Sequence, residues 1–117
     1  LYNYHNCKKA NKKTVFVVEG FKSVWRLHEW GYENVVAVMG SHLPDYQVKL
    51  LIALDAKIVV IGDNDESGKA FNQAVVNKLH YFCEVQKIDI SVTECDPSDS
   101  VAELSQKEFE ELIGGTK

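Results

Sequence analysis

Short apolar runs alternate with longer amphipathic stretches along most of the chain. The runs TVFVV (14–18), VVAVM (35–39) and KIVVI (57–61) have the β-branched, continuous character of strands that are buried on both faces. Between these runs, apolar residues recur at intervals of three and four, which is typical of helices with one buried face. The alternation predicts a parallel sheet whose strands are joined by helices.

Four helices are predicted from this spacing and from their end signals. They are expected over 21–30, from Pro44 to about 55, from about Ser67 for some four turns, and between 105 and 114.

Two of these helices carry more specific signals. Val24, Leu27 and His28 are expected to share one face of the first helix. In the last helix, Ser105 and Glu108 have the spacing of a capping box.

A weaker alternating segment over 85–92 predicts a fourth strand nearer the edge of the sheet. We therefore expect an α/β fold with three layers, α/β/α, around a four-stranded parallel sheet. The expected strand order is 2-1-3-4, which makes the first and third strands neighbours. In such a sheet, ligands bind beyond the carboxyl ends of the strands, where the strand order reverses.

Three acidic residues follow the strands at that edge. Glu19 ends the first strand, and Asp63 and Asp65 follow the third. Carboxylates that converge repel one another and raise each other's pKa unless a cation compensates. Ligation by oxygen alone suits Mg²⁺ or Mn²⁺, and zinc is disfavoured because no His/Cys cluster is nearby. The alternative is that the aspartates only form a turn that caps the next helix.

Glycines flank these acids and are expected to support the turn. Gly20 would let the backbone pass close to a ligand, and Gly62 and Gly68 would relax the turn around the aspartates. The chain contains neither GxGxxG nor GxxxxGK[ST], so it has no dinucleotide fingerprint and no P-loop. We therefore interpret Lys69, in the SGK tripeptide, as a surface lysine in preference to a phosphate contact.

Length and composition set the class of protein. The 117 residues are 45% hydrophobic, which is enough for one globular core. No apolar run reaches the roughly 18 residues of a membrane span, and the first residues lack the apolar region of a signal peptide. A cytoplasmic protein without a membrane partner is expected. Three widely spaced cysteines, Cys7, Cys83 and Cys95, suit reduced thiols better than a disulfide framework or a CxxC site.

The net charge of −4 argues against a domain that binds nucleic acid unaided. One basic cluster lies ahead of the first strand, and two interpretations of it stay open: a solvated leader or a contact with phosphate. The cluster consists of Lys8, Lys9, Lys12 and Lys13.

Three motifs in order resemble the Toprim domain, in the form found in bacterial DnaG-type DNA primases. They are VFVVEGFKSV, VVAVMGSHL and KIVVIGDNDESGKA, and CDPSD follows them. The resemblance covers roughly residues 2–100. It implies a leader from a longer primase chain over 1–13 and a Toprim domain with a C-terminal helix over 14–117.

The resemblance implies a role for each acidic residue. Glu19 matches the glutamate that acts as a general acid/base in phosphoryl transfer, and Asp63 and Asp65 match the pair that binds Mg²⁺. Asp96, and Asp99 one position from the usual place, would supply further metal ligands.

Two positions depart from the family pattern. Ser98, in the CDPSD segment, occupies the place of the family's usual second aspartate, and Ser23 stands four residues after the glutamate, where these primases usually have an aspartate. The number of metal ions, and whether catalysis is retained, therefore stay open.

By this resemblance the chain is expected to support RNA primer synthesis by nucleotidyl transfer during DNA replication. NTPs, the RNA primer and a single-stranded DNA template would be its substrates, and a replicative helicase would be a partner in the primosome through other regions. The 117 residues alone are expected to be inactive, because too little basic surface is present to hold a template.

Four alternatives stay open. Topoisomerases usually have small residues after the glutamate-glycine pair, where Phe21 and Lys22 resemble the primase form better. Nucleases of the overcoming-lysogenization type share the carboxylates, and a non-catalytic relic would keep only binding. A phospho-acceptor receiver domain would need a lysine after the fourth strand, which residues 92–94 do not offer.

Overall fold

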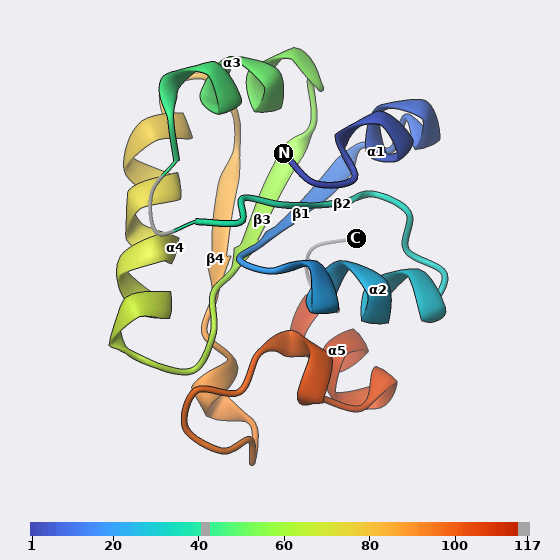
Figure 1. Cartoon of the computed structure of the whole chain (residues 1–117), viewed down its shortest axis with the longest axis vertical. Coiled ribbons are helices and arrows are strands. Elements are labelled where there is room, and N and C mark those ends of the chain that lie inside the picture. The colour runs from blue at the N-terminus through green and yellow to red at the C-terminus, as the bar shows by residue number, and fades with distance from the viewer. Residues whose placement is uncertain (41–42, 115–117) are drawn as a thin grey trace.

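One parallel sheet separates two helical layers in the computed structural model of the chain (Figure 1). The structure describes residues 1–40 and 43–114. The strands are β1 (Thr14–Val18), β2 (Val35–Ala37), β3 (Lys57–Ile61) and β4 (Val85–Ile88). Their order is β2-β1-β3-β4 and all neighbours are parallel, which confirms the predicted sheet and fold class.

Helices cover both faces of this sheet. They are α1 (Tyr4–Ala10), α2 (Phe21–Glu29), α3 (Asp45–Ala53), α4 (Glu66–Leu79) and α5 (Gln106–Ile113), with the 3₁₀ turns η1 (Ile90–Val92) and η2 (Val101–Glu103). None of the helices in the described part of the chain has the length and apolarity to cross a membrane. Ser41 and His42 of the second motif, and residues 115–117 of the predicted domain, lie outside the described residues.

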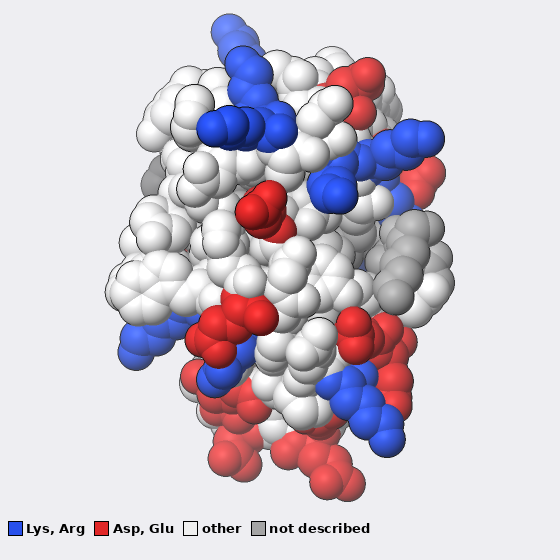
Figure 2. All heavy atoms as spheres, turned by 90° about the vertical axis from the view of Figure 1, so that its right-hand side faces the viewer, with Lys and Arg blue, Asp and Glu red and all other residues white. Residues whose placement is uncertain are grey.

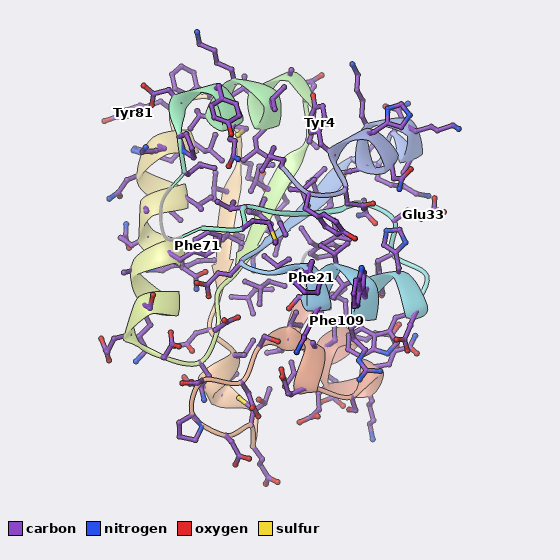
Figure 3. The ribbon with its side chains drawn as sticks, in the orientation of Figure 1. Tyr4, Phe21, Glu33, Phe71, Tyr81 and Phe109 are labelled. Carbon is purple, nitrogen blue, oxygen red and sulfur yellow. The ribbon has the colours of Figure 1, made fainter. Side chains whose placement is uncertain are left out.

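Successive residues of each strand pack into two different cores. Phe16 of β1 packs with α2, α5 and η2, whereas Val17 packs with α1, α3 and α4. Phe109 and Phe71 are among the largest side chains of the two cores, with exposed fractions of 0% and 2% (Figure 3). Burial on both faces explains why the central strands are continuously apolar.

The first residues form a helix that the hydrophobic pattern did not predict. Cys7 of α1 is buried with an exposed fraction of 1% and shares a core with Val36. Tyr2 pairs with Ala37 of β2, because each backbone N–H donates to the other residue's carbonyl oxygen, at 2.9 and 3.1 Å. A helix with one buried residue has no detectable apolar period, which is why the pattern of residues did not reveal it.

The fourth strand is shorter than predicted. It ends at Ile88, and 90–92 forms η1 instead of continuing the strand. The side chain of Asp89 accepts a hydrogen bond from the Ser91 backbone N–H at 2.9 Å, which starts the 3₁₀ turn. A short polar side chain thus competes with the strand for this backbone.

Two side-chain predictions for the helices have different outcomes. Of the residues predicted to share one face of α2, Val24 and Leu27 are buried, whereas His28 is exposed and lies 3.0 Å from the Asn3 amide in a hydrogen bond. The capping box of α5 is confirmed, because Ser105 Oγ accepts from the Glu108 N–H and Glu108 Oε1 accepts from the Ser105 N–H.

Replacing Cys7 with serine should lower the free energy of unfolding by about 1–3 kcal/mol, because a hydroxyl would replace a thiol in an apolar core. Burial raises the pKa of the Cys7 thiol to about 11, so the residue should also react slowly with thiol reagents. Urea unfolding measures the first effect. His5→Ser, on an exposed position of the same helix, is the matched control, and equal stability of the two variants would contradict the packing of α1.

Candidate active site

The carboxyl ends of β1 and β3 bring Glu19 and Asp63 together. Val18 pairs with Ile61 at the end of the parallel ladder, so the residues that follow leave the sheet side by side. Glu19 Oε2 accepts a hydrogen bond of 2.6 Å from the backbone N–H of Asp63. The predicted meeting of these two strand ends is therefore present in the structure.

The carboxyl group of Asp63 has a strongly raised pKa. Burial raises its pKa to about 7, and the negative charges of Glu19, Asp65 and Glu103 and a side-chain hydrogen bond with Glu19 add to the effect. An ionised Asp63 is thus unfavourable near neutral pH unless a cation lies beside it.

Asp65 begins α4. Its Oδ1 accepts a hydrogen bond of 2.6 Å from the Gly68 N–H, as an N-cap. The alternative interpretation of the aspartate pair as a turn and cap therefore holds for this oxygen. The helix begins at Glu66, one residue earlier than predicted.

Two glycines allow the turn to fold tightly on itself. A Cβ on Gly68 would lie 1.9 Å from the Asp63 carbonyl oxygen, and one on Gly62 would lie 2.3 Å from the Gly68 carbonyl oxygen. A Cβ on Gly20 would have no atom of the described residues within 4 Å, so the predicted role of Gly20 toward a ligand stays a prediction. Lys69 is exposed and lies 3.9 Å from Glu66, as expected for a surface lysine.

Asn72 anchors the exit of β3 and was missed from the sequence. This residue is buried, with an exposed fraction of 5%. Its Oδ1 accepts from the Gly62 N–H at 2.7 Å, and its Nδ2 donates to the Ile88 carbonyl oxygen at 3.2 Å. An asparagine on the apolar face of a helix, next to Phe71, is the signal that could have revealed it.

The CDPSD segment (95–99) contacts the turn at residues 63–65 through backbone hydrogen bonds. The Asn64 N–H donates to the Asp99 carbonyl oxygen at 2.7 Å, and the Ser98 N–H donates to the Asn64 carbonyl oxygen at 2.7 Å. The Asp99 carboxylate turns back to accept from the Asp96 N–H at 2.9 Å. Ser98 has a φ of 67°, a left-handed conformation that aspartate tolerates as well as serine does.

These predicted ligands do not form one compact group. Across residues 1–40 and 43–114, no three His, Cys, Asp or Glu side chains are placed to hold a metal ion together. The structure brings Glu19 and Asp63 into contact, puts Asp65 within electrostatic reach, and holds Asp96 and Asp99 in the neighbouring loop.

Glu103 joins the site from η2 and was also missed. Its Oε2 accepts from the Ser100 N–H at 2.8 Å and from the Ser100 hydroxyl at 2.6 Å, in a second capping box. The spacing of Ser100 and Glu103 is the sequence signal for this turn.

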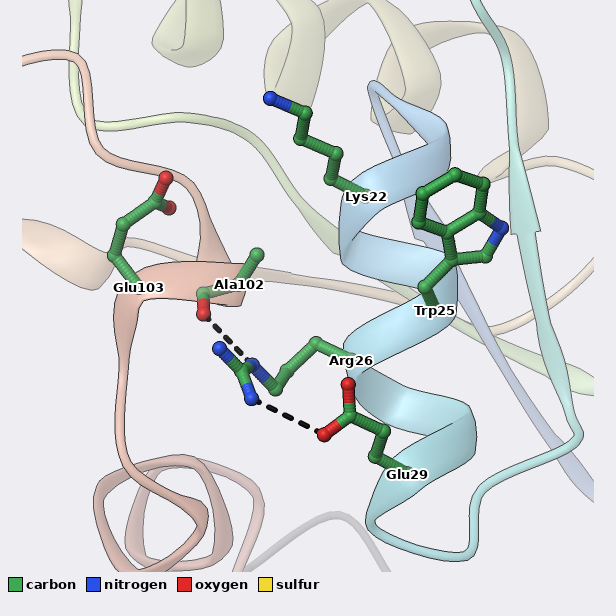
Figure 4. A pocket seen from close by; sticks show the side chains of 6 residues that line it. All are labelled: Lys22, Trp25, Arg26, Glu29, Ala102 and Glu103. Atoms are coloured by element: carbon green, nitrogen blue, oxygen red, sulfur yellow. Dashed lines mark hydrogen bonds and ion pairs between the residues drawn. The ribbon is translucent and has the colours of Figure 1, made fainter.

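Asp63 lines a pocket of about 190 Å³. The other lining residues are Gly20, Phe21, Lys22, Ser23 and Ser100. Lys22 also lines a neighbouring hollow of about 470 Å³, which Figure 4 shows together with Glu103. There Arg26 links α2 to η2, because its Nε donates to the Ala102 carbonyl oxygen at 3.0 Å and its Nη1 lies 3.2 Å from Glu29.

Comparison with known proteins gives consistent matches. A family model described as the Toprim domain matches residues 13–94. A DNA primase of Campylobacter jejuni is 33% identical over 99 residues, which cover 84% of this chain and 16% of that protein. The crystal structure of the Aquifex aeolicus primase, with its zinc-binding and RNA polymerase domains, has a TM-score of 0.77 and 28% identity, and the match covers 97% of this chain and 28% of that one. The chain thus spans less than a third of each of these proteins.

Without divalent cations, the unfolding free energy should fall as the pH rises from about 4 to about 7. The Asp63 pKa is about 7 in the folded chain and 3.8 ordinarily, so in this range the folded state binds more protons than the unfolded state. Thermal melts in EDTA at several pH values measure the trend. Asp63→Asn should flatten it, and an unchanged slope in that variant would contradict the proximity of these carboxylates.

Gly68→Ala should destabilise the fold by about 3 kcal/mol, because the added methyl group meets the Asp63 backbone. Gly20→Ala is the matched control, since its methyl group would enter open space and its φ of −129° suits alanine. Urea unfolding of both variants decides the matter, and similar midpoints would refute the tight packing of the turn.

Proposed function

Because the chain belongs to the Toprim domain family, we propose that it is the metal-dependent catalytic domain of a DNA primase. In this proposal it supports nucleotidyl transfer from NTPs to an RNA primer on single-stranded DNA. It acts as part of a longer chain, other regions of which contact the replicative helicase. The primases among its relatives support this assignment.

One observation carries the proposal: Glu19 and Asp63 meet at the carboxyl ends of two neighbouring strands. This edge is where open parallel sheets bind ligands. A raised pKa of Asp63 is what a site built for a cation shows when no cation balances its charge. Half-buried carboxylates held this close repel one another, and a bound cation would offset that cost to stability.

The donor groups fit a hard divalent cation. Asp63 offers carboxylate oxygens, and Asp65 commits only Oδ1 to the helix cap, so its second oxygen remains for a ligand. Mg²⁺ usually takes one or two protein carboxylates and completes its shell with water and substrate phosphates. A compact group of three side chains is therefore not required. Asp96 and Asp99, in the loop docked on Asn64, are proposed as further ligands acting from that loop.

When bound, Mg²⁺ or Mn²⁺ would supply charge neutralisation for the phosphates. The chain's own residues do the rest. Glu19 is proposed to take the proton of the attacking 3′-hydroxyl at its carboxylate, and the hydrogen bond from the Asp63 N–H fixes the orientation of that carboxylate. Lys22, which lines the pocket beside Asp63, is placed to attract phosphate.

The first test is metal binding. Wild-type protein should bind Mn²⁺ in titration calorimetry and gain thermal stability from it by linkage, whereas Asp63→Asn should lose both effects. In EDTA the same variant should be as stable as wild type or more stable, because it relieves like-charge crowding.

Asp55→Asn is the matched control for this test. It removes the same charge from an exposed residue before β3, at the opposite end of the strand, where the φ of 51° suits asparagine. Retention of Mn²⁺ affinity in Asp63→Asn would reject the site, and a loss of stability in EDTA would favour a purely structural turn.

The second test is primer synthesis. The 117 residues alone should make no primers, since their net charge of −4 leaves little basic surface for a template. In a primase chain that contains this domain, Glu19→Gln should slow nucleotide addition by about 10²- to 10⁴-fold, the usual contribution of a positioned acid/base.

Labelled NTPs on single-stranded DNA, with and without Mg²⁺, provide the measurement. Robust synthesis by the 117 residues would overturn the need for other regions. Undiminished synthesis by the Glu19→Gln primase would remove the role proposed for that residue.

A further inference from the structure

A groove lined by aromatic and polar side chains runs between α1 and α2. Two adjoining hollows of about 490 and 370 Å³ form it, and both are lined by Asn6 and His28. Trp25 lines one end and Lys9 lines the other. We call it the α1–α2 groove.

The groove is linked to the carboxylate site through shared lining residues. Trp25 also lines the hollow shown in Figure 4, and Lys22 lines both that hollow and the pocket that contains Asp63. A series of hollows that share lining residues therefore leads from Asp63, past Lys22 and Trp25, to Lys9.

Trp25 presents a fixed aromatic surface at the start of the groove. Its exposed fraction is 54%, unusual for so large an apolar group. The indole Nε1 donates to the Tyr2 hydroxyl at 2.9 Å, and the ring of Phe21 lies 4.8 Å away between centroids. Neighbouring groups thus hold the indole in place without covering it, which lowers the entropy lost when a flat ligand stacks on it.

The middle of the groove offers ordered hydrogen-bonding groups. Asn3 Nδ2 donates to the Val35 carbonyl oxygen at 2.9 Å and lies 3.0 Å from His28 Nε2, while Asn6 donates to Asn3 Oδ1 at 2.9 Å. These bonds use both amide protons of Asn3 and one ring nitrogen of His28. The groups that match the edges of a nucleobase are therefore the remaining atoms of the Asn6 amide and His28 Nδ1.

Charge at the far end is suited to phosphate. Figure 2 shows that Lys and Arg side chains predominate over the upper part of this face, where α1 lies, with some Asp and Glu side chains among them, whereas Asp and Glu predominate below. On the α2 side, Glu29 forms an exposed ion pair with Arg26 at 3.2 Å, and Glu33 lines the groove opposite the cation of Lys9. A polynucleotide would therefore follow the α1 side of the groove, where Lys9 lies.

We propose that the α1–α2 groove binds several nucleotides of a single-stranded polynucleotide, with a base stacked on Trp25 and phosphates near Lys9. This inference rests on the proposed function, since it gives a polynucleotide whose end lies at Asp63 a path across the surface. It also assigns Lys9, a member of the basic cluster ahead of β1, to phosphate contact.

The test uses the 117-residue chain and labelled oligonucleotides of about ten nucleotides, oligo(dT) and oligo(rU), in EDTA. Because the net charge is −4, binding is measured by fluorescence anisotropy at about 20 mM salt, where screening is weak. The difference in affinity between the two oligonucleotides identifies the strand as template-like DNA or primer-like RNA. Either preference supports the groove.

Trp25→Ala should weaken binding by about 10-fold, and Trp25→Phe, which keeps an aromatic face, should weaken it less. Tyr81→Ala is the matched control, because Tyr81 is an aromatic residue with an exposed fraction of 82% on the loop after α4, outside the groove. Lys9→Gln should lower the slope of log affinity against log salt by about 0.7, whereas Lys49→Gln, on an exposed position of α3, should not.

Absence of binding to both oligonucleotides at low salt would overturn the proposal and leave the groove to a protein contact. Equal effects of Trp25→Ala and Tyr81→Ala would overturn it as well. A parallel Mn²⁺ titration separates this failure from that of the proposed function: Mn²⁺ binding without oligonucleotide binding removes the groove alone, and the reverse removes the metal site alone.

Discussion

The parallel register between β1 and β3 is the constraint on which the site depends. Five consecutive residue pairs join these strands, from Thr14 with Lys57 to Val18 with Ile61. A slip of one residue would turn every buried side chain of a strand to the opposite face, so the two apolar cores fix this register strongly. The position of Glu19 beside Asp63 is thus a consequence of core packing far from either carboxylate.

At the ends of β1 and β3, backbone hydrogen bonds offset the destabilising repulsion between the carboxylate side chains. Crowded carboxylates destabilise the turn, but its N–H groups are well satisfied: Asp63 donates to Glu19, Gly68 to Asp65, and Gly62 to Asn72. Each acid therefore has a structural contact through one oxygen or one backbone group, and Asp63 also lines the pocket. This arrangement explains how one turn can be both the start of α4 and a candidate metal site.

The sequence predicted those parts of the fold that depend on repeated pattern. Three apolar runs and the amphipathic spacing between them were enough for the strand order and for the meeting of Glu19 with Asp63. The predictions that were wrong or incomplete concern single side chains whose hydrogen bonds leave no periodic pattern in the sequence. Asn72 reaches across to Ile88, and η1 replaces the end of a strand through one side chain, Asp89.

The metal ligands remain predictions for a related reason. Spacing along the chain indicates which carboxylates reach the same edge of the sheet, but the distance between oxygens depends on side-chain rotamers and on the ion itself. Asp96 and Asp99 illustrate this, because their loop is fixed by the main chain of Asn64 while the Asp99 carboxylate bonds within its own loop. The sequence pattern therefore indicates that this loop lies beside the site, but it does not determine which carboxylate oxygens of the loop would bind a metal.

The pairing of Tyr2 with Ala37 has a consequence for association between molecules. β2 is an edge strand, and its open side would present unpaired N–H and C=O groups to any other extended chain. The two hydrogen bonds between Tyr2 and Ala37 occupy that side, and α1 then covers the apolar residues behind it. The N-terminal segment thus blocks edge-to-edge association of sheets from different molecules. This role is independent of catalysis and of nucleic-acid binding.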